Sequence, residues 1–164
     1  MHDQAYQWFA KFETHAPDTT VIEVGSKIVQ GTIRPLFEGT RYVGIDPQAG
    51  DGVDVVASGI DYTPDAPVDI VLSPEMAEHT PFWREIFANC IAMLKPGGLF
   101  IATMAGPGRA PHGVNIDDPD KRGWYANIEP GDLAYVFAFN DLVEDYEVDQ
   151  LGEDVRCWAR KCAE

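Results

Sequence analysis

Two short apolar runs constrain the fold of this chain more than any other feature of the sequence. The first, Thr20 to Gly25, is rich in β-branched residues and ends in glycine, and the second, Arg41 to Asp46, ends in an acid about 20 residues later. A glycine turn lets the backbone approach a ligand, and a carboxylate after the next strand accepts hydrogen bonds from ribose hydroxyls. The pair therefore predicts two neighbouring strands of a ligand-binding α/β sheet.

Strand and helix patterns alternate through the rest of the chain, which indicates parallel βαβ units. Further strands are predicted at 52–57, 68–73 and 99–104, and a terminal pair at 145–151 and 155–161. Helices are predicted at 4–15, 82–94 and 132–139, with a weaker pattern at 28–37. We expect an α/β fold: a Rossmann-like, open, mostly parallel seven-stranded sheet with helices on both faces and a C-terminal antiparallel strand pair. Residues 1–164 are expected to form a single domain.

Charge and cysteine content exclude several classes of protein. The chain has 12 basic and 27 acidic residues, a net charge of -15, which lacks the basic footprint of nucleic-acid binders. Its three cysteines show no metal-binding or disulfide spacing. The N-terminus does not resemble a signal peptide, and no apolar run is long enough to span a membrane. We expect a cytoplasmic protein that binds neither nucleic acid nor membranes.

The glycine spacing narrows the ligand class. Gly25 and Gly31 are separated by five residues with no glycine between them. A dinucleotide site usually has closely spaced glycines that admit a pyrophosphate. The spacing therefore favours a ribosyl ligand without a pyrophosphate, and an enzyme that uses NAD or a nucleotide sugar is the less favoured alternative.

Four segments in this order resemble the class I S-adenosylmethionine-dependent methyltransferases. They are IEVGSKIVQG, YVGIDP, VDIVLSPEMAEH and the helix that runs into MLKPGGLFIAT. The resemblance covers roughly residues 19–106, and it lacks the compact G-x-G-x-G turn that is usual in the family. It implies S-adenosylmethionine as cofactor.

The resemblance also implies which residues contact the cofactor. The residues expected near the methionine and ribose parts are Glu23, Gly25, Ser26 and Asp46. Those expected near the adenine are Pro47, Ser58, Gly59 and Ile60. Ser73 and Glu75 are expected near the transferable methyl group. Asp46 is expected to bind the ribose hydroxyls. The family often has an aspartate near position 58 that accepts from the adenine amino group, so the serine there predicts a weaker contact, or one made by Asp61.

Residues after the predicted fourth and fifth strands are candidates for contact with the methyl acceptor. The loop at 106–113 contains Arg109, which could bind an anionic group, and His112, which could accept a proton. His79 is a further catalytic candidate. The alternative for each is a purely structural role. The aromatic pair Trp124 and Tyr125 is interpreted either as a lid or as packing.

No metal site is predicted from the sequence. Three acids in the loop after the fifth strand fit no EF-hand spacing and are interpreted as solvated. These residues are Asp117, Asp118 and Asp120.

The predicted function is methyl transfer to a small-molecule or sugar-type acceptor. The chain adds little to the minimal fold, and Leu72-Ser73-Pro74-Glu75 departs from the (N/D)-P-P-(Y/F) motif of amino-directed DNA methyltransferases. Recognition by a partner subunit or in a homo-oligomer is left open. The alternative function is a catalytically silent S-adenosylmethionine-binding module in a larger assembly.

Overall fold

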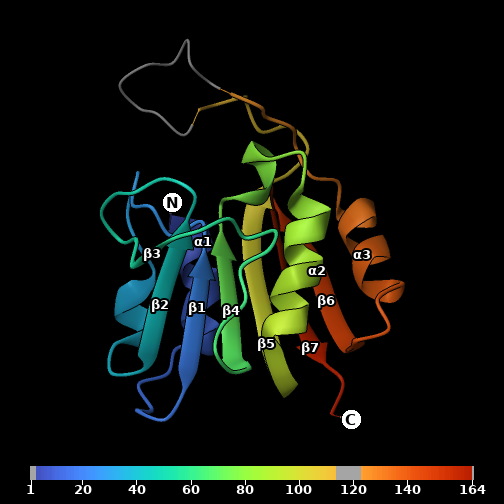
Figure 1. Cartoon of the computed structure of the whole chain (residues 1–164). Helices are drawn as coiled ribbons and strands as arrows, with labels where there is room; N and C mark the ends of the chain where they lie inside the picture. Colours follow the sequence, from blue (N-terminus) through green and yellow to red (C-terminus); the bar gives the residue numbers. More distant parts are fainter. Residues whose placement is uncertain (1–2, 114–122, 164) are drawn as a thin grey trace.

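All strands in the part of the chain that the computed structural model describes, residues 3–113 and 123–163, belong to one sheet. The strand order is β3-β2-β1-β4-β5-β7-β6 (Figure 1). The strands are β1 (Thr20–Val24), β2 (Arg41–Asp46), β3 (Val55–Val56), β4 (Val68–Pro74), β5 (Leu94–Ala105), β6 (Val143–Leu151) and β7 (Asp154–Lys161).

The first five strands in sequence run parallel, and the last two complete the sheet as an antiparallel pair. β1 pairs in parallel with β2 and β4, β2 with β3, and β4 with β5. β7 is antiparallel to both β5 and β6. The predicted fold class is confirmed. The carboxyl ends of β1 to β5 consequently meet at one edge, where ligands bind in open α/β sheets.

Helices cover both faces of the sheet (Figure 1). They are α1 (Asp3–Phe9), η1 (Ala10–Phe12), η2 (Arg34–Phe37), η3 (Ala77–His79), α2 (Trp83–Met93) and α3 (Pro130–Ala138). On one face α2 and α3 bury Phe87 and Phe137 on either side of Phe100 of β5, at ring centroid distances of 4.7 and 6.2 Å. On the other face α1 and η2 bury Phe9 and Phe37 against Val21 of β1.

Two of the predicted helices are shorter than the sequence pattern indicates. The helix expected at 4–15 ends as a 3₁₀ turn at Phe12, because the next residues bond to another part of the chain: the amide of Thr14 donates to the carbonyl of Leu36 at 3.1 Å. The weaker pattern at 28–37 forms only η2. Gly31 has a φ of +81°, and Pro35 lacks the amide that a regular helix needs.

The strand expected at 52–57 is also short, whereas the one expected at 99–104 is longer. Only Val55 and Val56 form the strand that pairs with β2. The residue before them, Asp54, also bonds to β2: its amide donates to the carbonyl of Gly44 at 2.8 Å, and its carboxylate accepts the amide of Gly44 at 2.7 Å and pairs with Arg34. β5 begins at Leu94, directly after α2, and so includes the Lys-Pro-Gly-Gly segment that was predicted only to end the helix.

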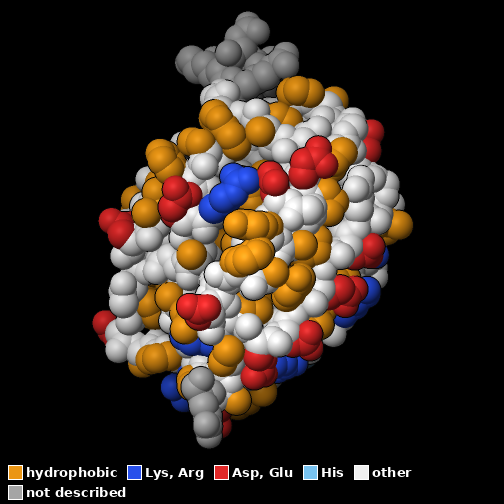
Figure 2. Space-filling model, turned by 90° about the vertical axis from the view of Figure 1, so that its right-hand side faces the viewer, with side chains coloured by type: hydrophobic (Ala, Val, Ile, Leu, Met, Phe, Trp, Pro, Cys, Tyr) orange, Lys and Arg blue, Asp and Glu red, His pale blue; other side chains and the backbone are white. Residues whose placement is uncertain are grey.

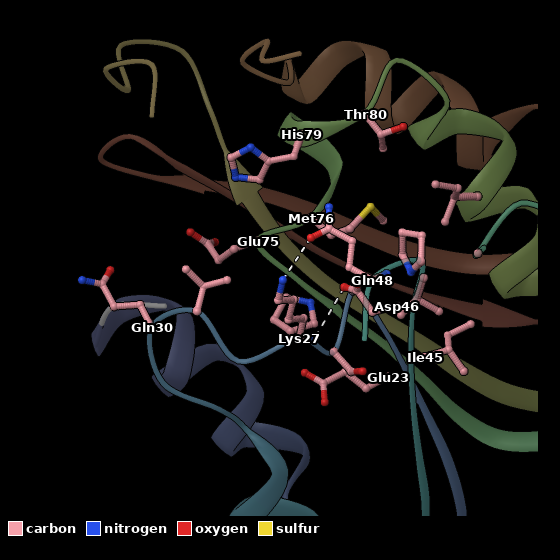
Figure 3. Close-up of a pocket in the computed structure, with 18 of the residues that line it drawn as sticks. Glu23, Lys27, Gln30, Ile45, Asp46, Gln48, Glu75, Met76, His79 and Thr80 are labelled. Carbon is pink, nitrogen blue, oxygen red and sulfur yellow. Dashed lines mark hydrogen bonds between the residues drawn. The ribbon is translucent and has the colours of Figure 1, made fainter. Parts of the chain in front are cut away.

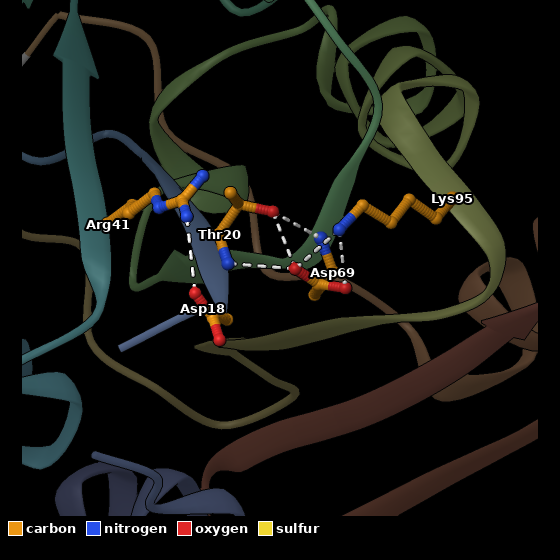
Figure 4. A network of polar contacts seen from close by, with 5 residues as sticks. All are labelled: Asp18, Thr20, Arg41, Asp69 and Lys95. Carbon is orange, nitrogen blue, oxygen red and sulfur yellow. Dashed lines mark hydrogen bonds and ion pairs between the residues drawn. The ribbon is translucent and has the colours of Figure 1, made fainter. Parts of the chain in front are cut away.

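A polar network joins three strands at the opposite, amino-terminal edge of the sheet (Figure 4). The carboxylate of Asp69 in β4 accepts hydrogen bonds from the amide and hydroxyl of Thr20 in β1, at 2.8 and 2.6 Å. It also accepts from Lys95 Nζ of β5 at 2.8 Å. The hydrogen bonds from Lys95 and Thr20 outweigh partial burial and lower the pKa of Asp69 to about 2. The network fixes the starts of the strands whose other ends form the site.

The face of the molecule at the β6 edge carries apolar side chains interspersed with acidic ones (Figure 2). Exposed aromatic residues of this region include Tyr135 in α3 and Phe139 just after it, whose ring centroids lie 4.4 Å apart. In the described residues, no helix is both long enough and apolar enough to cross a membrane.

Candidate active site

A cavity of about 890 Å³ opens at the carboxyl ends of the parallel strands (Figure 3). Apart from Ser73, and from Asp61 as the alternative adenine contact, the residues predicted to contact the cofactor or the acceptor line it. Those that do are Glu23, Gly25, Ser26, Asp46, Pro47, Ser58, Gly59, Ile60, Glu75, His79, Arg109 and His112. The structure thus brings together residues from five separate segments, while their individual roles remain predictions.

Ser73 is fully buried and does not line the cavity. Side chains alternate along a strand, so Ser73 lies on the same face of β4 as Val71, which packs in the core beneath α2. The sequence placed it near the strand end correctly but did not determine which face it occupies.

The backbone takes unusual conformations at the ends of β1 and β4. Gly25 has a φ of +82°, and a Cβ atom at this position would lie 2.7 Å from Cγ of Met76. Glu75, directly after β4, has a φ of +51°, which is uncommon for a residue other than glycine. Such conformations occur frequently at ligand-binding sites. Glycine at position 25 therefore allows the two strand ends to approach each other beside the cavity.

The carboxylate of Asp46 is held in place by main-chain amides. Oδ1 accepts from the amide of Gln48 at 2.8 Å, and Oδ2 accepts from the amide of Lys27 at 3.4 Å. The Lys27 ammonium in turn donates to Gln48 Oε1 at 3.0 Å (Figure 3). A carboxylate has about four acceptor positions, so Asp46 can still accept two more hydrogen bonds from a ligand.

Glu23 is a buried acid at the bottom of the cavity, with an exposed fraction of 4 %. The Tyr42 hydroxyl donates to its Oε2 at 2.7 Å. Arg34 stacks over the Tyr42 ring at 4.7 Å and pairs with Asp54. Burial raises the pKa of Glu23 to about 7, and the hydrogen bond from Tyr42 and the charge of Arg34 only partly oppose this effect. Glu23 can therefore exchange a proton near neutral pH.

The segment after β3 forms another wall. The Ser58 hydroxyl accepts the amide of Ile60 at 3.2 Å, and Gly59 packs so closely that an added Cβ would lie 2.6 Å from Val24. Asp61, the alternative contact for an adenine amino group, does not line the cavity.

Arg109 is placed between two carboxylates. Its guanidinium pairs with Asp154 of β7 and lies 3.6 Å from Glu75 Oε2. The carbonyl of Arg109 accepts a hydrogen bond from the side-chain amide of Asn127 at 3.1 Å. These contacts fit the structural alternative, in which Arg109 fixes the loop that follows β5.

Two histidines and a tyrosine lie together at the side of the cavity near this loop. The ring centroids of His79 and His112 are 5.0 Å apart, and the Tyr125 ring lies 5.7 Å from His79 and 5.0 Å from His112. Burial, and secondarily His112, lowers the pKa of His79 to about 4. Tyr125 thus contacts both histidines. The three acids predicted to be solvated, Asp117, Asp118 and Asp120, lie outside the described residues.

Sequence reasoning missed Glu78, which is fully buried beside these histidines. Burial raises its pKa to about 8, with the nearby Glu75 as the second cause. The short polar segment around Glu78 and His79 shows no hydrophobic periodicity. The sequence therefore does not indicate whether Glu78 is buried or exposed. Only the packing of η3 beneath the loop after β5 reveals it.

Comparison with known proteins supports this reading of the fold. Residues 25–102 match the family model described as a methyltransferase domain. No curated protein matches the sequence.

Several solved structures share the fold at low sequence identity. The Burkholderia thailandensis 1,6-didemethyltoxoflavin-N1-methyltransferase, with 1,6-didemethyltoxoflavin and S-adenosylhomocysteine bound, is 16% identical, with a TM-score of 0.67 over 97% of this chain and 77% of that one. The DhpI–SAH complex is 17% identical, with a TM-score of 0.71 over 98% and 85%. A putative methyltransferase in complex with the Haloferax volcanii Trm112 activator is 15% identical, with a TM-score of 0.64 over 96% and 89%. The match of residues 25–102 to the methyltransferase-domain model bears out the resemblance predicted from the sequence, and these solved structures share its fold.

Proposed function

We propose that this protein is a methyltransferase that uses S-adenosylmethionine and acts on a small-molecule or sugar-type acceptor. The observation that carries the proposal is the convergence of Gly25, Asp46 and Glu75 on one cavity at the carboxyl ends of β1, β2 and β4. The match of residues 25–102 to a methyltransferase domain supports it, as do structural neighbours that hold S-adenosylhomocysteine.

The chemistry of the cavity fits this cofactor. The Asp46 carboxylate has acceptor positions left for two ribose hydroxyls. The Ser26 hydroxyl is buried beside it, with no hydrogen-bond partner among the described residues. Gly25 permits the close approach of Met76 at the end of β1, where a Cβ atom would lie 2.7 Å from Met76 Cγ. A ligand with a ribose and no pyrophosphate therefore suits these groups better than a dinucleotide.

When bound, S-adenosylmethionine supplies a methyl group on a sulfonium, and the acceptor displaces the sulfur in line. The protein's part is mainly to position the two reactants. Asp46 holds the ribose, and the segment from Ser58 to Ile60 lies beside the adenine. Glu75 stands between the cofactor half of the cavity and the half lined by His79 and His112, where the acceptor binds.

A labelled-methyl assay tests this function. The protein is incubated with methyl-labelled S-adenosylmethionine and separate panels of hydroxyl, amine and thiol acceptors, and label in the product is measured. Asp46→Ala serves as the control that removes the proposed ribose contact. We expect transfer to at least one acceptor class by the wild type, reduced in the variant. Cofactor binding without transfer to any acceptor, including those in cell extracts, would instead indicate a silent binding module.

A further inference from the structure

Three potential metal ligands meet where the loop after β5 packs on η3. Glu78 and His79 belong to η3, and His112 belongs to the loop. One ligand atom from each side chain lies within 4.8 Å of the other two. Ligands about 2.0–2.2 Å from a zinc ion lie roughly 3.3–3.6 Å from one another in a tetrahedral site. The three groups therefore need to move by only about 1 Å to bind one ion.

Polar atoms of this cluster are buried away from solvent. Nδ1 of His79 has no hydrogen-bond partner among the described residues, and the carboxylate of Glu78, which is 0% exposed, lies near the main-chain amides of Ala105 and of Glu78 itself. Leaving a buried polar atom without a partner costs folding free energy. A cation between Glu78 and His79 would satisfy both side chains at once.

The surroundings of His112 match those of a metal-bound imidazole. Its Nδ1 lies 3.2 Å from the carbonyl oxygen of Ala110. A histidine that binds a metal through one nitrogen commonly donates its other N–H to a carbonyl or carboxylate, which fixes the tautomer. A proton on Nδ1 leaves the lone pair on Nε2. The Tyr125 ring contacts both imidazoles and restricts their orientation.

We propose that Glu78, His79 and His112 form a binding site for one divalent transition-metal ion of the zinc type. Imidazole nitrogens favour zinc and related ions over magnesium or calcium, which prefer oxygen ligands alone. Three protein ligands leave at least one coordination position free, as in catalytic zinc sites. Because His79 and His112 line the cavity, the free position faces the acceptor half.

The ion also defines an acceptor class, an inference that rests on the proposed methyltransferase function. An acceptor hydroxyl bound at the free position would lose its proton to solvent more readily, because the ion stabilises the negative oxygen. Its lone pair would then form the O–CH₃ bond, and the electrons of the broken C–S bond would remain on sulfur. The two histidines then act as ligands and not as the proton acceptors predicted from the sequence.

Calorimetric titration of the full chain with zinc chloride, after dialysis against a chelator, tests the site without any acceptor or methyl donor. We expect one ion per chain. Loss of an outer-shell partner of a metal ligand costs about 10–100-fold in affinity, so His112→Ala and His79→Ala, which remove ligands, are expected to weaken binding by at least about 100-fold. The matched control is His15→Ala, at an exposed histidine that bonds to Glu13 and Glu38.

His112 lies in a loop, so its replacement leaves the core intact, and circular dichroism verifies folding of each variant. Absence of saturable zinc binding by the wild type would overturn the proposal. So would unchanged affinity in both folded ligand variants. Titration of the same samples with S-adenosylhomocysteine separates the two proposals. If the protein binds S-adenosylhomocysteine but does not bind zinc, only the metal site is overturned. If it binds zinc but does not bind S-adenosylhomocysteine, only the cofactor assignment is overturned.

Discussion

Replacing Asp46 with alanine removes the carboxylate expected to hold the ribose of the cofactor. The side chain is partly exposed and already accepts two main-chain amides, so the lower end of the range for hydrogen bonds to a charged group applies, about 1.5 kcal/mol each. Two such bonds correspond to a loss of about 3 kcal/mol. At 1.4 kcal/mol per factor of ten, S-adenosylhomocysteine should bind roughly 100- to 150-fold more weakly.

Isothermal calorimetry with S-adenosylhomocysteine measures this loss directly. Asp51→Ala is the matched control, because Asp51 is an exposed acid of the same loop that does not line the cavity. Asp46→Asn keeps an oxygen for the Gln48 amide but not the charge, and should fall between the wild type and Asp46→Ala. Wild-type affinity in a folded Asp46→Ala variant would refute the assignment of Asp46 to the ribose.

Three further predictions concern stability, each measured by urea unfolding. Glu23 has a folded pKa of about 7 against an ordinary 4.5, so the folded state binds its proton more tightly than the unfolded state. The stability that this contributes is complete below pH 4.5 and is lost as the pH rises to about 7. Relative to Glu23→Gln, the free energy of unfolding of the wild type should fall by about 3 kcal/mol over this range, and parallel pH profiles would contradict this prediction. Gly25→Ala should destabilise the protein more than Gly97→Ala. Both positions have a left-handed backbone, which costs an alanine roughly 1–2 kcal/mol, but only the alanine at position 25 would also collide with a neighbour, Met76. Equal losses of stability would disprove the contact with Met76. Asp69→Ala should lower the free energy of unfolding by about 1 kcal/mol, a small value because the ion pair with Lys95 is partly exposed. The substitution should leave S-adenosylhomocysteine affinity unchanged, because Asp69 lies at the edge of the sheet opposite the cavity. Weakened binding of S-adenosylhomocysteine would contradict this second expectation.

The strands and the ligand-binding edge could be predicted from the sequence because both depend on local patterns. A β-branched run that ends at Gly25 and another that ends at Asp46 specify two strand ends, and parallel pairing then brings those ends together. Helix lengths could not be predicted in the same way. The segment after Phe12 has a helical pattern, but the hydrogen bond from Thr14 to Leu36 takes its place.

The half of the cavity lined by His79 and His112 depends on tertiary contacts that no sequence pattern encodes. His79 and His112 are 33 positions apart in the chain, and only the packing of the loop after β5 on η3 brings their rings within 5.0 Å. The same packing buries Glu78 and pairs Arg109 with Asp154. A substrate-binding role for Arg109 was plausible from its loop alone, whereas its partners become visible only in the folded chain.

Titration of the wild-type protein with S-adenosylhomocysteine, and separately with NAD, tests the central assignment most directly. The cavity contains Asp46, the acid that we propose binds the ribose, but its glycines are not spaced to admit a pyrophosphate. We therefore expect S-adenosylhomocysteine to bind at one site per chain with micromolar affinity, and NAD to give no comparable heat. Saturable binding of NAD with no response to S-adenosylhomocysteine would contradict the assignment.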